Sequence, residues 1–199
     1  MGDAPRPAGA GRRGPGGGGR LLAGGRAAVD LALAAPERVR ALVLVGSGLA
    51  GHRFQEPALF ELWDRSEGAL ERGDHREAAR VEIDTWVAGM DRPPEAVDPE
   101  VRRRVTGMLL TAYAHGEADL EEPDPPAAGR LGEITAPTLV VVGEHDRPDI
   151  QAVADALAAG IPGAERVVLD GAAHLPSMER PGEFNRVVLE FLANLDRPP

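Results

Sequence analysis

The stretch APTLVVVGEHD (136–146) has the pattern of a buried strand that ends in polar residues. Its apolar run is continuous, which is typical of a strand buried on both faces of a parallel sheet. Similar runs occur in ALVLV (41–45) and in ERVVLDGAAH (165–174). Helical patterns alternate with these strands, at 26–35, at 148–160 and from Pro181 onward. Strands alternating with helices predict an α/β fold with a wound, right-handed parallel sheet.

Between the first two predicted strands, the segment 52–128 has a different character. It contains both tryptophans and the only tyrosine, and three helical stretches are predicted at about 57–71, 74–89 and 98–114. We therefore predict a helical insertion in the α/β unit. Its large apolar side chains are expected to form mainly the core of this insertion: Phe54, Phe60, Trp63, Trp86, Met90, Met108 and Tyr113.

Composition excludes several classes of function. The net charge of −10 and the pI of about 5.0 argue against a nucleic-acid-binding protein. Because the chain has no cysteine, disulfides, zinc–thiolate sites and thiol nucleophiles are excluded. The longest strand-like apolar run is far shorter than the ~20 residues of a membrane span, and no secretory signal pattern is present. These features predict a cytoplasmic protein with no membrane partner.

Residues 1–20 consist almost only of Gly, Pro, Ala and Arg, without a hydrophobic period, and are predicted to be disordered. All 22 basic residues of the chain are Arg, which indicates a very GC-rich gene. The stretch 14–19 matches the G-x-G-x-x-G dinucleotide pattern, but no strand precedes it, so we expect no nucleotide cofactor. A faint similarity to RGG segments that contact RNA is outweighed by the acidic net charge.

Two polar residues stand where chemistry is expected in a parallel sheet, at the carboxyl ends of strands. Asp146 ends the second strand, and His174 lies just past the third. A carboxylate at one strand end and an imidazole at the next can meet, so that Asp146 holds one ring nitrogen while His174 accepts a proton. Taken singly, the aspartate could be a helix cap and the histidine structural. A metal site of His145, Asp146 and His174 is disfavoured because adjacent strand residues point apart, and no metal is expected.

Three segments resemble the α/β-hydrolase family, over about residues 24–195. RAAVDLALAAPERVRALVLVGSG (26–48) resembles the helix after the nucleophile and the sixth strand of that family. LGEITAPTLVVVGEHDRPD (131–149) resembles its seventh strand with the triad acid, at Asp146. VVLDGAAHLPSMERPGEFNRVVLEFL (167–192) resembles its eighth strand, the triad histidine at His174, and the closing helix. The nearest similarity is to small esterases and enol-lactonases.

The resemblance implies the C-terminal part of an α/β-hydrolase fold with a helical cap. The predicted organisation is a disordered segment at 1–20, an incomplete core at 21–51 and 129–199, and a cap at 52–128. The implied partner is a small ester or lactone, without an organic cofactor or a metal. In an intact member a serine attacks the carbonyl, His174 acts as base and then acid, and Asp146 orients it.

The nucleophile motif of the family, Gly-x-Ser-x-Gly-Gly, does not have its serine here. Aligning its last two glycines on Gly24-Gly25 places Arg20 at the first glycine and Leu22 at the nucleophile. Of the oxyanion hole, the backbone N–H of Ala23 is the remaining candidate donor. GRRGPGGGGR (11–20) stands where the fifth strand is expected, and the earlier strands have no counterpart.

The three serines of the chain are not placed on such a motif. Ser47 is expected in a turn after the first strand, Ser66 on the solvated side of a cap helix, and Ser177 in a loop where it hydrogen-bonds. Asp30 lies within a helix. We therefore predict a hydrolase-family chain that is inactive as it stands, N-terminally truncated or altered by a wrong start or frameshift. The alternative is a non-catalytic remnant that binds a ligand or partner.

Overall fold

The computed structural model describes residues 22–115 and 123–195, so the prediction of disorder for 1–20 lies outside the described residues. Three strands form a parallel sheet in the order β1 (Leu42–Val45), β2 (Thr138–Gly143) and β3 (Glu165–Leu169). All three lie within the segments predicted to be strands. In the register, Val45 lies beside Val141, and Gly143 beside Leu169. The polar residues that follow the strands therefore meet at one end of the sheet.

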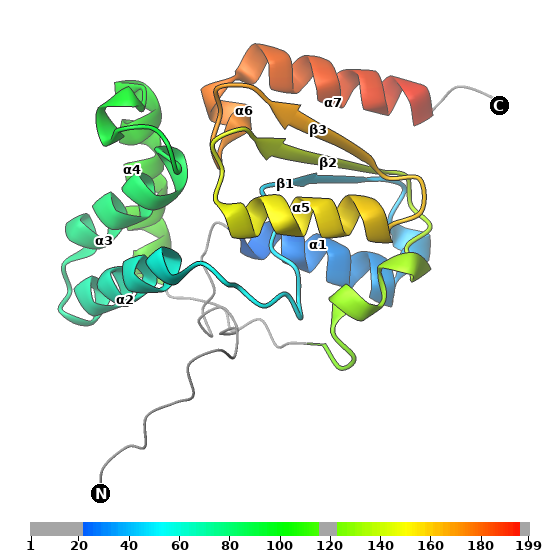
Figure 1. Ribbon diagram of the computed structural model, residues 1–199, viewed down its shortest axis with the longest axis horizontal. Helices are drawn as coiled ribbons and strands as arrows, with labels where there is room; N and C mark the ends of the chain where they lie inside the picture. The colour runs from blue at the N-terminus through cyan, green and yellow to red at the C-terminus, as the bar shows by residue number, and fades with distance from the viewer. Residues whose placement is uncertain (1–21, 116–122, 196–199) are drawn as a thin grey trace, which may run out of the picture.

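Helices cover both faces of the sheet, as the continuous apolar run of β2 predicts. Figure 1 shows α1 (Ala23–Ala34) and α5 (Pro148–Gly160) on one face and α7 (Pro181–Leu195) on the other. All six residues of β2 are buried. Because side chains alternate along a strand, Val140 and Val142 pack with α5, whereas Leu139 and Val141 pack with α7.

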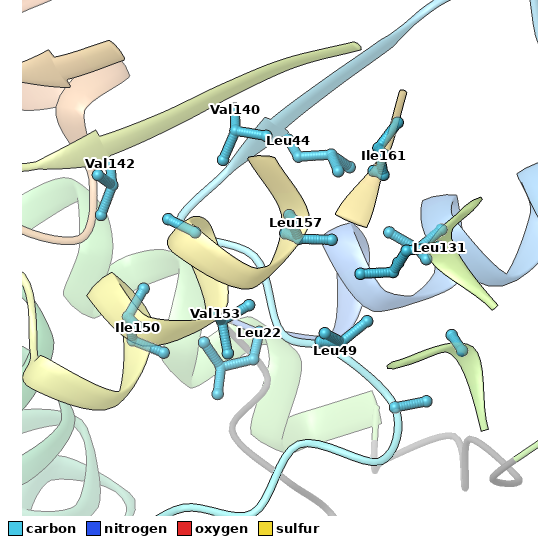
Figure 2. Packing of buried hydrophobic residues seen from close by; sticks show 14 of the residues in the cluster. Leu22, Leu44, Leu49, Leu131, Val140, Val142, Ile150, Val153, Leu157 and Ile161 are labelled. Atoms are coloured by element: carbon cyan, nitrogen blue, oxygen red, sulfur yellow. The ribbon is translucent and has the colours of Figure 1, made fainter. Parts of the chain in front are cut away.

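The face covered by α1 and α5 contains the largest apolar cluster. Figure 2 shows Leu44 and Val140 above Leu157 of α5, with Ile150 and Val153 on the same helix. Both α5 and α7 begin with proline at the first helical position, where the missing N–H leaves no helical hydrogen bond unmade. The strands that lead to the polar residues are thus packed between apolar clusters on both faces of the sheet.

The inserted segment forms α2 (Pro57–Glu71), α3 (His75–Glu82) and α4 (Pro99–His115), close to the predicted helices. In Figure 1 these helices lie beyond the carboxyl ends of the strands. After α3 the chain continues through one π-helical turn, Ile83–Val87. A short helix, α6 (Pro176–Glu179), precedes α7 and has no counterpart in the sequence prediction. No helix of the described residues is long and apolar enough to cross a membrane.

The large apolar residues of the insertion are distributed differently from the expectation. Phe54, Trp63 and Trp86 belong to the same apolar cluster as α1 and α5, so they join the insertion to the sheet layers. Tyr113 packs within the second cluster, which the inserted helices dominate. Met90 and Met108 are exposed, Met108 at 61%, so the expectation that they form part of a core is wrong. The division into core and cap remains a prediction.

Candidate active site

The turn after β2 brings its polar residues to the loop that follows β3. The Asp146 N–H donates to the Gly143 carbonyl at 3.1 Å, which closes a tight turn at the strand end. The His145 N–H donates to the Ala172 carbonyl at 2.9 Å, which links this turn to the loop after β3. A backbone hydrogen bond therefore joins the two loops, in addition to any contact between their side chains.

Asp146 and His174 face each other across these loops. His174 Nδ1 lies 2.9 Å from Asp146 Oδ2 and 3.1 Å from Oδ1, and the two residues are only 2% and 4% exposed. Asp146 Oδ1 also accepts the Arg147 backbone N–H at 2.8 Å. Because an ionised carboxylate only accepts hydrogen bonds, Nδ1 is the donor when it pairs with ionised Asp146. The arrangement suits proton transfer at Nε2, and the catalytic roles stay a prediction.

The imidazole of His174 is enclosed by the turn after β1 and by the inserted segment. Gly46, at φ +50°, leaves room for the ring, since a Cβ there would lie 2.8 Å from Cε1 and 2.9 Å from Nδ1. On another side the indole of Trp86 lies 4.8 Å from the imidazole, centroid to centroid. The backbone N–H of His174 donates to the Trp86 carbonyl at 3.2 Å. A residue of the insertion thus contacts both the ring and the backbone of His174.

Trp86 is itself fixed by polar contacts. Its indole N–H donates to Glu82 Oε2 at 2.8 Å, and the hydroxyl of Ser66 donates to Glu82 Oε1 at 2.9 Å. Ser66 is buried, so the expectation that it is solvated is wrong. The reason is that Ser66 lies on the buried face of α2, together with Leu59, Trp63 and Ala69. Trp86 is not among the predicted site residues, because nothing in its local sequence indicates that it packs on His174.

The position aligned with the nucleophile is part of the core. Leu22 precedes α1 with φ −94° and ψ −18°, is 4% exposed and packs in the cluster that Figure 2 shows. A nucleophile elbow is a strained turn, whereas no non-glycine residue in the described ranges has a positive φ. Ala23 is the first residue of α1, where N–H groups lack intrahelical partners. Its role as an oxyanion donor stays a prediction.

The remaining serines are accounted for by their surroundings. Ser47 is buried in the turn after β1, where its hydroxyl donates to the Gly48 carbonyl at 2.7 Å. Ser177 is exposed on α6. Among the described residues, no group of three or more His, Cys, Asp or Glu side chains is arranged to hold a metal ion.

Charged residues beside Asp146 attach the start of the insertion to α5. Arg147 forms a buried ion pair with Glu56, and burial lowers the pKa of the Arg147 guanidinium, an effect that the charge of Asp149 offsets in part. Asp149 accepts the backbone N–H groups of Gln55 and Glu56 at 2.9–3.0 Å. The sequence analysis missed these contacts, because their partners lie more than 90 residues apart.

The model of the alpha/beta hydrolase family matches residues 16–187. A 2-hydroxy-6-oxononadienedioate/2-hydroxy-6-oxononatrienedioate hydrolase of Cupriavidus pinatubonensis is 33% identical over 177 residues, which are 86% of this chain and 60% of that protein. The chain thus spans about three fifths of the length of the curated relatives it matches.

Solved structures show the same fold. A thermophilic esterase from Thermogutta terrifontis is 27% identical with a TM-score of 0.69, covering 89% of this chain and 64% of that one. A hydrolase from Pseudomonas aeruginosa is 31% identical with a TM-score of 0.63, covering 86% and 62%. These matches confirm the predicted partial α/β-hydrolase fold and the resemblance to esterase-like members. The chain belongs to the α/β-hydrolase family.

Proposed function

We propose that this chain carries the acid–base pair of a hydrolase site for small carboxylic esters or lactones, and that it has no turnover of its own with Leu22 at the nucleophile position. The observation that carries the proposal is the buried hydrogen bond between His174 Nδ1 and Asp146 at the ends of two adjacent strands. A buried carboxylate bonded to an imidazole is the base-and-orienter part of a catalytic triad.

The chemistry of this pair follows from its hydrogen bonds. With Nδ1–H directed at Asp146, Nε2 accepts the proton of a hydroxyl nucleophile as that oxygen attacks the substrate carbonyl. The Asp146 carboxylate then stabilises the imidazolium, which returns the proton to the leaving alkoxide. The N–H of Ala23, at the start of α1, is our candidate donor to the oxyanion.

Leu22 separates this pair from a working cycle, since a leucine side chain cannot form an acyl-enzyme. In a serine protease, removing the nucleophile costs roughly 10⁶-fold in turnover. In that protease the loss still leaves an acceleration of about 10³–10⁴-fold over water, which comes from the oxyanion hole and substrate binding. Because the Ala23 N–H is the one oxyanion donor that we propose among the described residues, we expect even less to remain here. The alternative is a non-catalytic protein that binds a small molecule or partner through its helical insertion.

The choice of substrates rests on the relatives. One solved structure with 26% identity is that of an N-acyl homoserine lactone degrading enzyme, and another is that of an esterase. The curated relatives are named for a 6-oxo dienedioate, whose name indicates a ketone flanked by carboxylate-bearing chains rather than an ester. The test therefore uses an activated ester, a lactone and a dienedioate of that class.

The test compares the full chain with His174→Gln and with His75→Gln, a control at an exposed histidine of α3. We expect all three proteins to give the uncatalysed rate with p-nitrophenyl acetate, an N-acyl homoserine lactone and the dienedioate, without a burst. Turnover that His174→Gln abolishes and His75→Gln keeps would refute the claim of inactivity. Saturable binding of one of these compounds without turnover would favour the binding alternative.

A further inference from the structure

The loop that carries His174 is held on both sides by one carboxylate. Glu179 Oε1, from α6, accepts the backbone N–H of Ala173 at 3.0 Å and that of Leu175 at 3.2 Å. These two residues directly flank His174 in the chain. The short helix α6 therefore folds back so that its last residue fixes the backbone around the histidine.

The second oxygen of this carboxylate binds an arginine of the insertion. Arg92 Nη2 donates to Glu179 Oε2 at 2.6 Å, and the two side chains are only 16% and 9% exposed. The same guanidinium donates to the carbonyls of Val87 at 2.7 Å and Ala88 at 2.9 Å, at the end of the π-helical turn. Its Nη1 donates to the Gly171 carbonyl at 2.8 Å. One guanidinium thus joins the turn after Trp86 to the loop before His174.

Backbone contacts extend the same junction to the loop of Asp146. The Met90 N–H donates to the His145 carbonyl at 3.0 Å, next to Asp146. Gly89, at φ +77°, allows this approach, because a Cβ there would overlap the His145 carbonyl oxygen. The segment 86–92 is therefore bonded to both loops that supply the acid–base pair.

We propose that Arg92 and Glu179 form a latch that positions His174 against Asp146 and makes this hydrogen bond depend on the docked insertion. Both are positioning residues, because Glu179 binds the backbone N–H groups on either side of His174 and Arg92 acts through Glu179 and the Gly171 carbonyl. This inference rests on the proposed function for one point, the role of His174 as a base. The latch itself is a property of the resting protein, so its test needs no turnover.

The test is the Glu179→Gln variant of the full chain, followed by NMR. The readout is the Nδ1 proton of His174, assigned by its loss in His174→Gln. Glutamine keeps the size of the side chain but removes the charge, and its amide N–H groups face the guanidinium of Arg92. We expect the Nδ1 proton and the amides of Ala173 and Leu175 to exchange with water at least tenfold faster. The amides of β2 should keep their protection.

Two further variants complete the design. Glu190→Gln removes the carboxylate of an exposed ion pair on α7 and should leave the Nδ1 proton unchanged. Arg92→Lys keeps the charge but cannot reach four acceptors at once, so it should accelerate the same three protons by a smaller factor. It also provides the test if Glu179→Gln does not fold.

Two results would overturn the latch. In the first, Glu179→Gln is folded and the Nδ1 proton and both flanking amides exchange as in the unmodified chain. In the second, both variants lose protection equally in β2 and around His174, which would make the pair a general contact of the fold. An accelerated Nδ1 proton with protected β2 amides would support the latch, whether or not the chain hydrolyses any ester.

Discussion

Replacing Leu22 by serine tests whether the position aligned with the nucleophile is an active-site position or a core position. The substitution introduces the hydroxyl that the family motif requires. Leu22 is 4% exposed, packs among the apolar residues of α1, α5 and the turn after β1, and has an unstrained backbone. We therefore expect Leu22→Ser to behave as a core substitution and not to create a reactive serine.

The magnitude follows from three effects. Truncating a buried leucine costs about 2–5 kcal/mol, depending on how far the cavity collapses. Placing a hydroxyl among apolar groups adds about 1 kcal/mol or more where no partner is within reach. Residue 22 is the N-cap of α1, where leucine makes no capping hydrogen bond, so a serine hydroxyl that accepts a first-turn N–H avoids this penalty and gains about 1 kcal/mol instead. The free energy of unfolding should fall by about 2–5 kcal/mol.

Urea unfolding followed by tryptophan fluorescence measures this loss, as a lower midpoint with an unchanged m-value. Leu189→Ser on α7 is the matched control, because Leu189 is 64% exposed and its replacement should change stability by less than about 0.5 kcal/mol. A Leu22→Ser protein that is as stable as the unmodified chain and reacts with a fluorophosphonate would refute the reasoning. Residue 22 would then be an accessible elbow.

Two further substitutions test other parts of the structure. Gly89→Ala should lower the free energy of unfolding, measured in urea, by about 2 kcal/mol or more, because alanine at φ +77° is strained by about 1–2 kcal/mol and its Cβ overlaps the His145 carbonyl. Gly107→Ala in α4, with open space around it, should instead gain about 0.5–1 kcal/mol, and equal effects at the two glycines would contradict this. Hydrogen bonds from Arg103 and Arg104 lower the pKa of Glu100 in α4 to about 2. A carboxyl whose pKa is lowered in the folded state stabilises the fold at pH values above its unfolded pKa near 4.5, and this stabilisation is lost as the pH falls toward 2. The Tm of Glu100→Gln should therefore fall less steeply than that of the unmodified chain between these pH values. The difference between the two proteins should shrink in high salt. The same fall in Tm with pH in Glu100→Gln and in the unmodified chain would contradict this prediction.

The sheet and the pairing of Asp146 with His174 could be predicted because their signals are local. A continuous apolar run such as 138–143 requires cover on both faces, and the structure places helices there. Residues directly after parallel strands gather at one edge, which is why Asp146 and His174 could be paired across 28 residues. Both inferences need only the period of the chain and the direction of the strands.

The surroundings of the pair could not be predicted, because they depend on how the insertion docks. Arg92 and Glu179 are 87 residues apart, and nothing in either local sequence selects the other as partner. The packing of Trp86 against His174 depends on a π-helical turn whose residues have no distinctive period. The exposure of Met108 and the burial of Ser66 likewise depend on which faces of α4 and α2 meet their neighbours.

The central claim is that His174, oriented by Asp146, is a base, and that no serine stands where this base could activate it. It is tested most directly by incubating the full chain with a fluorophosphonate and recording its intact mass, beside an active serine hydrolase as positive control. We expect the mass of the chain to stay unchanged while the control gains one adduct. A stoichiometric adduct on Ser47, Ser66, Ser177 or any other hydroxyl, lost in His174→Gln, would contradict the account.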